Sequence, residues 1–201
     1  RVVEKLAIEA SYFTEGTFKN NELYNNSPYF VKVNFKDQSF YGQKFNIVFN
    51  NNLSGGELIY YTGKTPHALK FKTGSWLKSE AFDINIYLNP EKEVKRISDI
   101  LKDNKSYFIV KSVDEVTSEL QSKLETRVLS ELAMTILINV KDLNPHKSRD
   151  VVNAICSEFL IYDVERKSES SKNILTFIDN QLSQVFNDLK VAETNLHVFM
   201  K

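Results

Sequence analysis

The chain has 201 residues, which is enough for one large domain or two small ones with a buried core. Its 26 Lys and Arg balance its 26 Asp and Glu, and this neutrality excludes electrostatic binding of nucleic acid, which needs a basic excess. The single cysteine, Cys156, excludes an internal disulfide, and no apolar run approaches the roughly 18 to 20 residues that span a bilayer.

The first residues predict the end of a helix. Val2, Val3, Leu6 and Ala7 share one helical face. No capping residue precedes them, and the chain begins with Arg1 in place of an initiator Met. We therefore expect a piece of a longer protein that starts within a helix.

Residues 11–88 predict a β-rich region. Aromatic and β-branched runs, separated by Asn- and Gly-bearing turns, indicate strands at 29–35, 45–49, 57–62, 68–71 and 82–88. The last run alternates strictly between apolar and polar side chains, which is typical of a half-buried strand. The aromatic density is compatible with a sugar-binding surface or with the core of a β-sandwich, and the core is the commoner explanation.

After Leu88 the predicted strands alternate with helices. Asn89 and Pro90 have the cap chemistry of a helix start, and Val94, Ile97 and Leu101 would be its apolar face. A strand at 106–110, a helix at 113–123 and a strand within 128–141 follow. The sequence Leu-Asn-Pro at 143–145 repeats the one at 88–90, so we expect a second helix to begin there.

That second helix is expected to run from Pro145 to Lys201, because no Gly or further Pro interrupts it. The first part of this helix has one apolar face, and we expect it to pack onto a sheet. The face consists of Val151, Ile155, Phe159 and Tyr162. Residues 165–173 include no apolar side chain. Beyond them the apolar positions are spaced four, three, four, three, which is a heptad seam. The seam consists of Ile178, Leu182, Val185, Leu189, Ala192, Leu196 and Phe199.

This pattern predicts a helix that leaves its domain and protrudes. A heptad seam needs a partner, which is either a later part of the chain or another subunit. The polar stretch before the seam is either a solvated helical face or an oligomer contact. Its candidate contact residues are Tyr162, Glu165, Arg166, Lys167 and Glu169.

No catalytic constellation is evident. Gly55-Gly56 and Gly63-Lys64-Thr65 resemble phosphate-binding loops, but Leu58 stands where a Walker A loop requires Gly, and turn residues explain both. The three histidines are far apart in sequence and lack metal-ligand spacing. Cys156 is expected to be a buried thiol. We expect no catalytic residue, metal or cofactor in this chain.

The order of the C-terminal motifs resembles a known family. The motifs are Leu143-Asn144-Pro145, Ala154-Ile155, Tyr162 with the stretch 165–170, Phe177-Ile178-Asp179 and Gln181-Leu182. They are similar to the Wzz-type chain-length-determinant region of polysaccharide co-polymerases, including those fused to Wzc-like bacterial tyrosine kinases. The match covers roughly residues 133–189, and residues 11–88 resemble more weakly an enlarged insertion of Bacteroidetes type.

Together, the patterns and the resemblance predict an α+β fold, with an α/β base domain, a β-rich insertion and a long protruding C-terminal helix. The expected parts are the end of a truncated base-domain helix (1–10), the insertion (11–88), the base domain (89–165) and the protruding helix (166–201).

The resemblance implies a homo-oligomer at the periplasmic face of the bacterial inner membrane. It would work with polysaccharide polymerase and export machinery in controlling exopolysaccharide or capsule chain length. Flanking segments absent here would hold it in the membrane, and any ATP-dependent tyrosine kinase would lie in the missing part of the parent protein. The alternative is a periplasmic adaptor-like subunit of an export pump, which predicts lipoyl-like β domains beside a helical hairpin.

Overall fold

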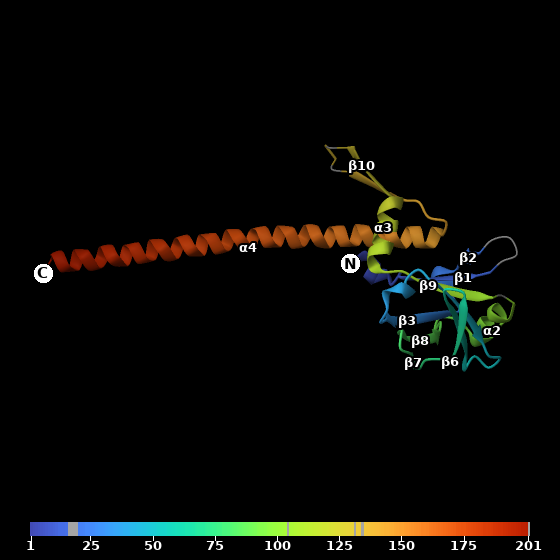
Figure 1. Ribbon diagram of the computed structural model, residues 1–201. Helices are drawn as coiled ribbons and strands as arrows, with labels where there is room; N and C mark the ends of the chain where they lie inside the picture. Colours follow the sequence, from blue (N-terminus) through green and yellow to red (C-terminus); the bar gives the residue numbers. More distant parts are fainter. Residues whose placement is uncertain (16–19, 104, 131, 134, 201) are drawn as a thin grey trace. The chain divides into compact units, whose positions relative to one another are not determined.

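The computed structural model describes residues 1–15, 20–103, 105–130, 132–133 and 135–200 (Figure 1). Its chain forms two compact units, Arg1–Ala154 and Ile155–Lys201. Several sheets combined with a long C-terminal helix confirm the predicted α+β class. The helices are α1 (Val2–Leu6), α2 (Val94–Asp103), α3 (Val113–Lys123) and α4 (Pro145–Phe199), with short 3₁₀ turns at Tyr24–Asn26 and Gln38–Phe40.

Among the described residues, the strands form three antiparallel sheets. A six-stranded sheet has the order β2-β1-β9-β4-β5-β6, a three-stranded sheet has the order β3-β8-β7, and β10 pairs with β11 as a hairpin. The bounds are β1 (Ala10–Thr14), β2 (Asn21–Glu22), β3 (Tyr29–Phe35), β4 (Lys44–Phe49), β5 (Gly55–Thr62), β6 (Thr65–Lys72), β7 (Trp76–Lys78), β8 (Phe82–Leu88), β9 (Ser106–Val110), β10 (Leu124–Ser130) and β11 (Thr135–Val140).

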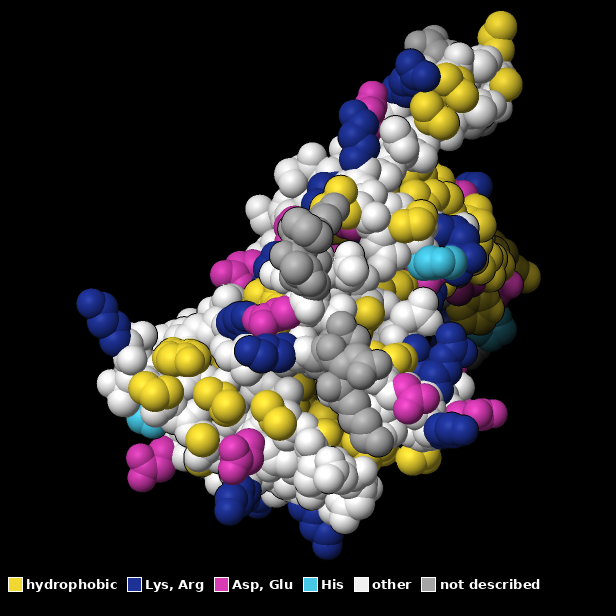
Figure 2. Space-filling view, turned by 90° about the vertical axis from the view of Figure 1, so that its right-hand side faces the viewer, with side chains coloured by type: hydrophobic (Ala, Val, Ile, Leu, Met, Phe, Trp, Pro, Cys, Tyr) yellow, Lys and Arg dark blue, Asp and Glu magenta, His cyan; other side chains and the backbone are white. Residues whose placement is uncertain are grey.

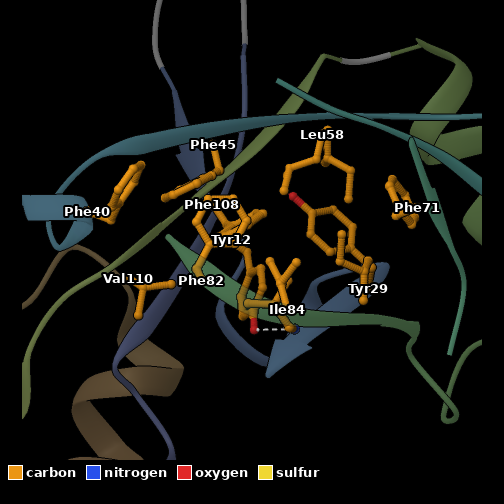
Figure 3. Close-up of a cluster of buried hydrophobic side chains, with 13 residues drawn as sticks. Tyr12, Tyr29, Phe40, Phe45, Leu58, Phe71, Phe82, Ile84, Phe108 and Val110 are labelled. Carbon is orange, nitrogen blue, oxygen red and sulfur yellow. Dashed lines mark hydrogen bonds between the residues drawn. The ribbon is translucent and has the colours of Figure 1, made fainter. Parts of the chain in front are cut away.

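The two larger sheets share one aromatic core (Figure 3). Phe45 of β4 stacks on Phe108 of β9, with ring centroids 5.2 Å apart and planes 7° apart. Phe82 of β8 meets Phe45 edge-on at 5.6 Å. All three side chains are fully buried. Core packing therefore explains these aromatic residues of the β-rich region.

The sequence predicted the strands with strong alternation. Phe82, Ile84 and Ile86 of β8 are buried, as the period-2 pattern predicts. Strands β2 and β7, with two and three residues, are too short to show a pattern. Strand β1 lacks a strict alternation of apolar and polar residues, and β10 directly continues the chain from α3, so neither was predicted. A single strand predicted within 128–141 is a hairpin, in which Val128 of β10 pairs with Ile136 of β11.

The predicted domain boundary at residue 88 does not separate compact units. Strand β9, from the region expected to be the base domain, lies between β1 and β4, so Phe108 pairs with both Tyr12 and Phe45. These ladders place the regions 11–88 and 89–165 in one sheet. The compact units instead divide between Ala154 and Ile155, earlier than the predicted boundary at 165.

The predicted cap at Asn89 is wrong, because α2 begins only at Val94. Asn89 is buried and serves a tertiary role instead. Its Nδ2 donates to the Ser27 carbonyl at 2.8 Å, and its Oδ1 accepts from the Glu91 backbone N–H at 3.0 Å. The same side chain thus closes a turn and ties it to the segment before β3.

The core predicts a large effect at Phe108. We expect Phe108→Ala to lower the free energy of unfolding by about 3–5 kcal/mol, because it removes a ring stacked between two sheets. Phe177→Ala is the matched control, since Phe177 on α4 is exposed, and it should change stability by less than about 0.5 kcal/mol. Urea denaturation followed by circular dichroism measures both, and equal effects would contradict this description of the core.

Candidate functional site

Helix α4 starts within the first compact unit at a well-formed cap. Asn144 Oδ1 accepts bonds from the backbone N–H groups of His146 at 3.1 Å and Lys147 at 3.2 Å. Lys147 Nζ lies 2.6 Å from the Glu22 carboxylate, and Val151 one turn later is buried. This cap confirms the helix start that the Leu-Asn-Pro sequence predicts here.

After Ala154 the helix is more exposed than its sequence predicts. Phe159 and Tyr162 have exposed fractions of 54% and 56%, so the expectation that they pack onto a sheet is wrong. Cys156 is also exposed, where a buried thiol was expected. Helical spacing shows only that side chains share a face, and the surrounding fold decides whether that face is covered.

The residues predicted as oligomer contacts lie on the exposed surface of α4. They are Tyr162, Glu165, Arg166, Lys167 and Glu169. Lys167 Nζ forms an ion pair with Asp163 Oδ2 at 2.7 Å, one helical turn earlier. Such a pair supports the helix by about 0.2–0.5 kcal/mol. The role of these residues in oligomer contacts stays a prediction.

The heptad seam is a continuous apolar stripe along the second compact unit. Ile178, Leu182, Val185, Leu189, Ala192, Leu196 and Phe199 are all exposed, and the six large side chains have exposed fractions from 52% to 90%. Leu175 extends the stripe by one step of seven before Leu182, and Phe186 flanks it. Exposed apolar stripes of this extent mark interaction surfaces in soluble regions of proteins.

A second candidate site is a cavity of about 570 Å³ within the first compact unit. Its walls come from β1, β3, the segment that leads into β1 and the start of α4. The aromatic lining residues are Tyr12, Tyr24, Phe30, Tyr41 and Tyr87. This volume lies within the usual range of about 300–1,000 Å³ for small-ligand sites.

The cavity contains two residues in an unusual backbone conformation. Ala7 and Tyr24 have φ angles of 47° and 46°, in the left-handed region that non-glycine residues avoid. Burial raises the pKa of Tyr24 to about 12, and the nearby Asp150 carboxylate adds to this rise. The Tyr12 hydroxyl accepts a hydrogen bond from the Val31 backbone N–H at 3.0 Å (Figure 3), and burial raises its pKa well above the ordinary value.

The sequence does not indicate this cavity, because the residues that line it come from distant segments. Its one local signal is the run Tyr12-Phe13-Thr14, whose residue types favour a strand, but Tyr12 and Phe13 are both large and aromatic, so the pattern does not indicate which of them faces inward. The side chains that line the cavity become neighbours only when β1 and β3 are held together by the core.

Lys111, at the cavity wall, belongs to a chain of ion pairs. Glu119 of α3 contacts Lys111 Nζ at 2.6 Å and Lys123 Nζ at 2.7 Å, and Lys123 reaches Asp142 at 2.8 Å. Hydrogen bonds from Lys111 and then Lys123 lower the pKa of Glu119 to about 2.

Basic and acidic side chains are interspersed on the face shown in Figure 2, in keeping with a neutral chain.

The residues that resemble phosphate-binding loops have structural roles. Gly55 and Gly56 lie within β5, and a Cβ at Gly56 would come 2.0 Å from the Val48 carbonyl oxygen. Gly63, with φ of 62°, lies in the turn between β5 and β6. Within the described residues, no group of three His, Cys, Asp or Glu side chains is arranged to hold a metal ion.

The chain matches no protein-family model and no curated protein. Among the described residues, no helix combines the length and the apolar character needed to cross a bilayer.

The Glu119 pairs predict a pH-dependent contribution to stability. Because folding lowers the pKa of Glu119 from its ordinary 4.5, this contribution is present above about pH 5 and is lost as the pH falls toward 2. We expect Glu119→Gln to cost at most about 1 kcal/mol near pH 6, since partly exposed pairs are screened.

The difference from the unmodified chain should shrink steadily between pH 5 and pH 2. Denaturation midpoints across that range measure it, with Glu57→Gln as the control, because Glu57 is exposed and forms no ion pair with the described residues. A difference that stays constant with pH would contradict the assignment.

Proposed function

We propose that this chain is a self-associating, non-catalytic module of a polysaccharide co-polymerase. It acts at the periplasmic face of the bacterial inner membrane and helps to set the chain length of exopolysaccharide or capsule during polymerisation and export. The order of its C-terminal motifs, which resembles the Wzz-type region, supports this assignment. Any tyrosine kinase activity of the parent protein belongs to a domain outside this chain.

The observation that carries the proposal is the exposed heptad seam on α4. Fully burying a Leu, Val, Ile or Phe side chain stabilises by about 1.5–3 kcal/mol. Each helix carries six such side chains between Ile178 and Phe199. The free energy gained by burying them on two helices therefore exceeds the estimated cost of about 4–15 kcal/mol for bringing two chains together. Pairing with a second copy of α4 removes this apolar surface from water.

The proposed mechanism is assembly. Identical subunits joined through α4 present identical surfaces around a common axis, as closed symmetric oligomers do. Their number and spacing would limit how far a polymer grows before it is released, and the chain itself makes or breaks no bond. The polar stretch with Tyr162, Arg166 and Glu169 would contribute contacts at the base of the paired helices.

The seam predicts a specific loss of association. We expect the mass of the unmodified chain to rise with concentration, and the double variant Leu182→Asp with Leu189→Asp to stay monomeric, because a charge at a seam position is costly to bury. Size-exclusion chromatography with light scattering measures the masses.

The matched control carries the same two charges off the seam, as Gln184→Asp with Asn187→Asp. It should associate like the unmodified chain and keep the same helix content by circular dichroism. Equal loss of association in both double variants would contradict a role for the seam.

The polysaccharide assignment has a separate test in the cell that makes the parent protein. In that cell, the parent protein is given the changes Leu182→Asp and Leu189→Asp. We expect the length distribution of the surface polysaccharide, seen by gel electrophoresis, to change while its sugar composition stays the same. An unchanged length distribution, despite loss of the oligomer, would refute the assignment and leave self-association intact.

A further inference from the structure

The 570 Å³ cavity lies against the edge of strand β3. Four consecutive residues of that strand, 30–33, line it. Because side chains alternate between the two faces of a strand, a cavity over one face would be lined by every second residue. Strand β3 is also the outer strand in the order β3-β8-β7. The cavity therefore exposes the backbone of an edge strand.

The hydrogen-bond pattern shows which backbone groups point into the cavity. The Lys36 N–H donates to the Ala81 carbonyl at 2.9 Å, which continues the ladder in which residue pairs of β3 and β8 keep one constant register. In an antiparallel ladder every second pair exchanges bonds, so the even residues of β3 bond to β8 and the odd ones point outward. The outward bond from the Val31 N–H to Tyr12 agrees with this parity.

Three outward groups have no partner among the described residues. They are the carbonyl of Val31 and both the N–H and the carbonyl of Val33. Val31 is buried and Val33 is half-buried, and an unpaired backbone group in such a place costs free energy. A row of unpaired groups on an edge strand is a template for another strand.

The charges next to this edge select the partner. Lys111 and Lys147 are neutralised by Glu119 and Glu22, whereas Lys32 has no carboxylate partner among the described residues. Its Nζ lies 5.9 Å from the ring centroid of Tyr87. Glu9 also lines the cavity, but on the segment that leads into β1, so Lys32 is the charge that lies directly alongside an added strand.

We propose that an extended peptide segment, with apolar residues alternating with an acidic one, adds to β3 as a further strand. Its backbone pairs with Val33 and with the Val31 carbonyl. Its apolar side chains face the inner side, where Val33, Tyr41 and Val110 line the cavity. Its acidic side chain faces the outer side, next to Lys32 and Tyr87. Binding by strand addition takes affinity from the backbone and specificity from alternate side chains.

The test uses the full chain and three labelled probe peptides, followed by fluorescence anisotropy. The first is acetyl-Val-Glu-Val-Glu-Val-amide, the second has the same sequence with alternate backbone nitrogens methylated, and the third has Lys in place of Glu. We expect the first peptide to bind and the other two to bind at least about tenfold more weakly, because a tenfold loss corresponds to about 1.4 kcal/mol.

Two variants of the chain test the same strand pairing by changing β3 in place of the peptide. Val33→Pro removes the outward N–H without removing a bond to β8, since proline is tolerated where an edge strand needs no donor. Val33→Thr keeps that N–H and is its control. Lys32→Glu reverses the charge beside the edge, and Lys70→Glu makes the same change on the exposed strand β6. We expect at least tenfold weaker binding only for Val33→Pro and Lys32→Glu.

Several outcomes would overturn the proposal. No binding of the first peptide up to about 1 mM, which corresponds to about −4.1 kcal/mol, is one of them. Equal binding of the methylated peptide is another, because it would place the contact in side chains alone. Concentration-dependent dimerisation that Val33→Pro abolishes and the seam variant retains would assign the edge to a second copy of this chain. The readouts are independent of those that test self-association through α4.

Discussion

Hydrogen bonding of β9 between β1 and β4 is the constraint on which the first compact unit depends. It joins the chain's first strand to its middle and places Phe108 against Phe45 at the centre of the core. The cavity depends on the same pairing, because β9 holds β1 in place and so brings the Tyr12 hydroxyl to the edge of β3. One non-local strand thus contributes both to the core of the fold and to the shape of its candidate binding site.

The two candidate sites use different physics. The α4 seam offers apolar area without hydrogen-bond partners, so it favours a symmetric helical partner. The free energy of that association would grow with the apolar area buried. The β3 edge offers directional backbone groups beside one unneutralised lysine, so it favours a short extended partner in a defined register. Under the two proposals, one module would assemble with copies of itself and independently hold a further polypeptide.

Local chemistry explains which expectations were met. The strict alternation in β8 depends on neighbours in sequence, and the strand lies at 82–88 as that pattern predicts. Helix α3 lies at the predicted 113–123, and its capping box between Ser112 and Glu115 is likewise local in sequence. The cap predicted at Asn89 failed although its residue type is the same as at Asn144. The Asn89 side chain finds the Ser27 carbonyl, a partner that is distant in sequence, and the helix starts later.

The sequence by itself determined the α+β class, most of the strands, the long helix and the spacing of its seam, because these follow from periodicities of two and 3.6 residues and from cap residues. Only the tertiary structure decided that the two predicted regions share a sheet, that Phe159 and Tyr162 are exposed, and that β3 has an open edge inside a cavity. The shared sheet depends on segments that pair across about sixty residues of chain, as β4 and β9 do at Asn46 and Tyr107, and the open edge depends on β3 having β8 as its one neighbour among the described strands. No local sequence pattern determines which strands pair, because the pairing depends on the free energy of packing the whole core.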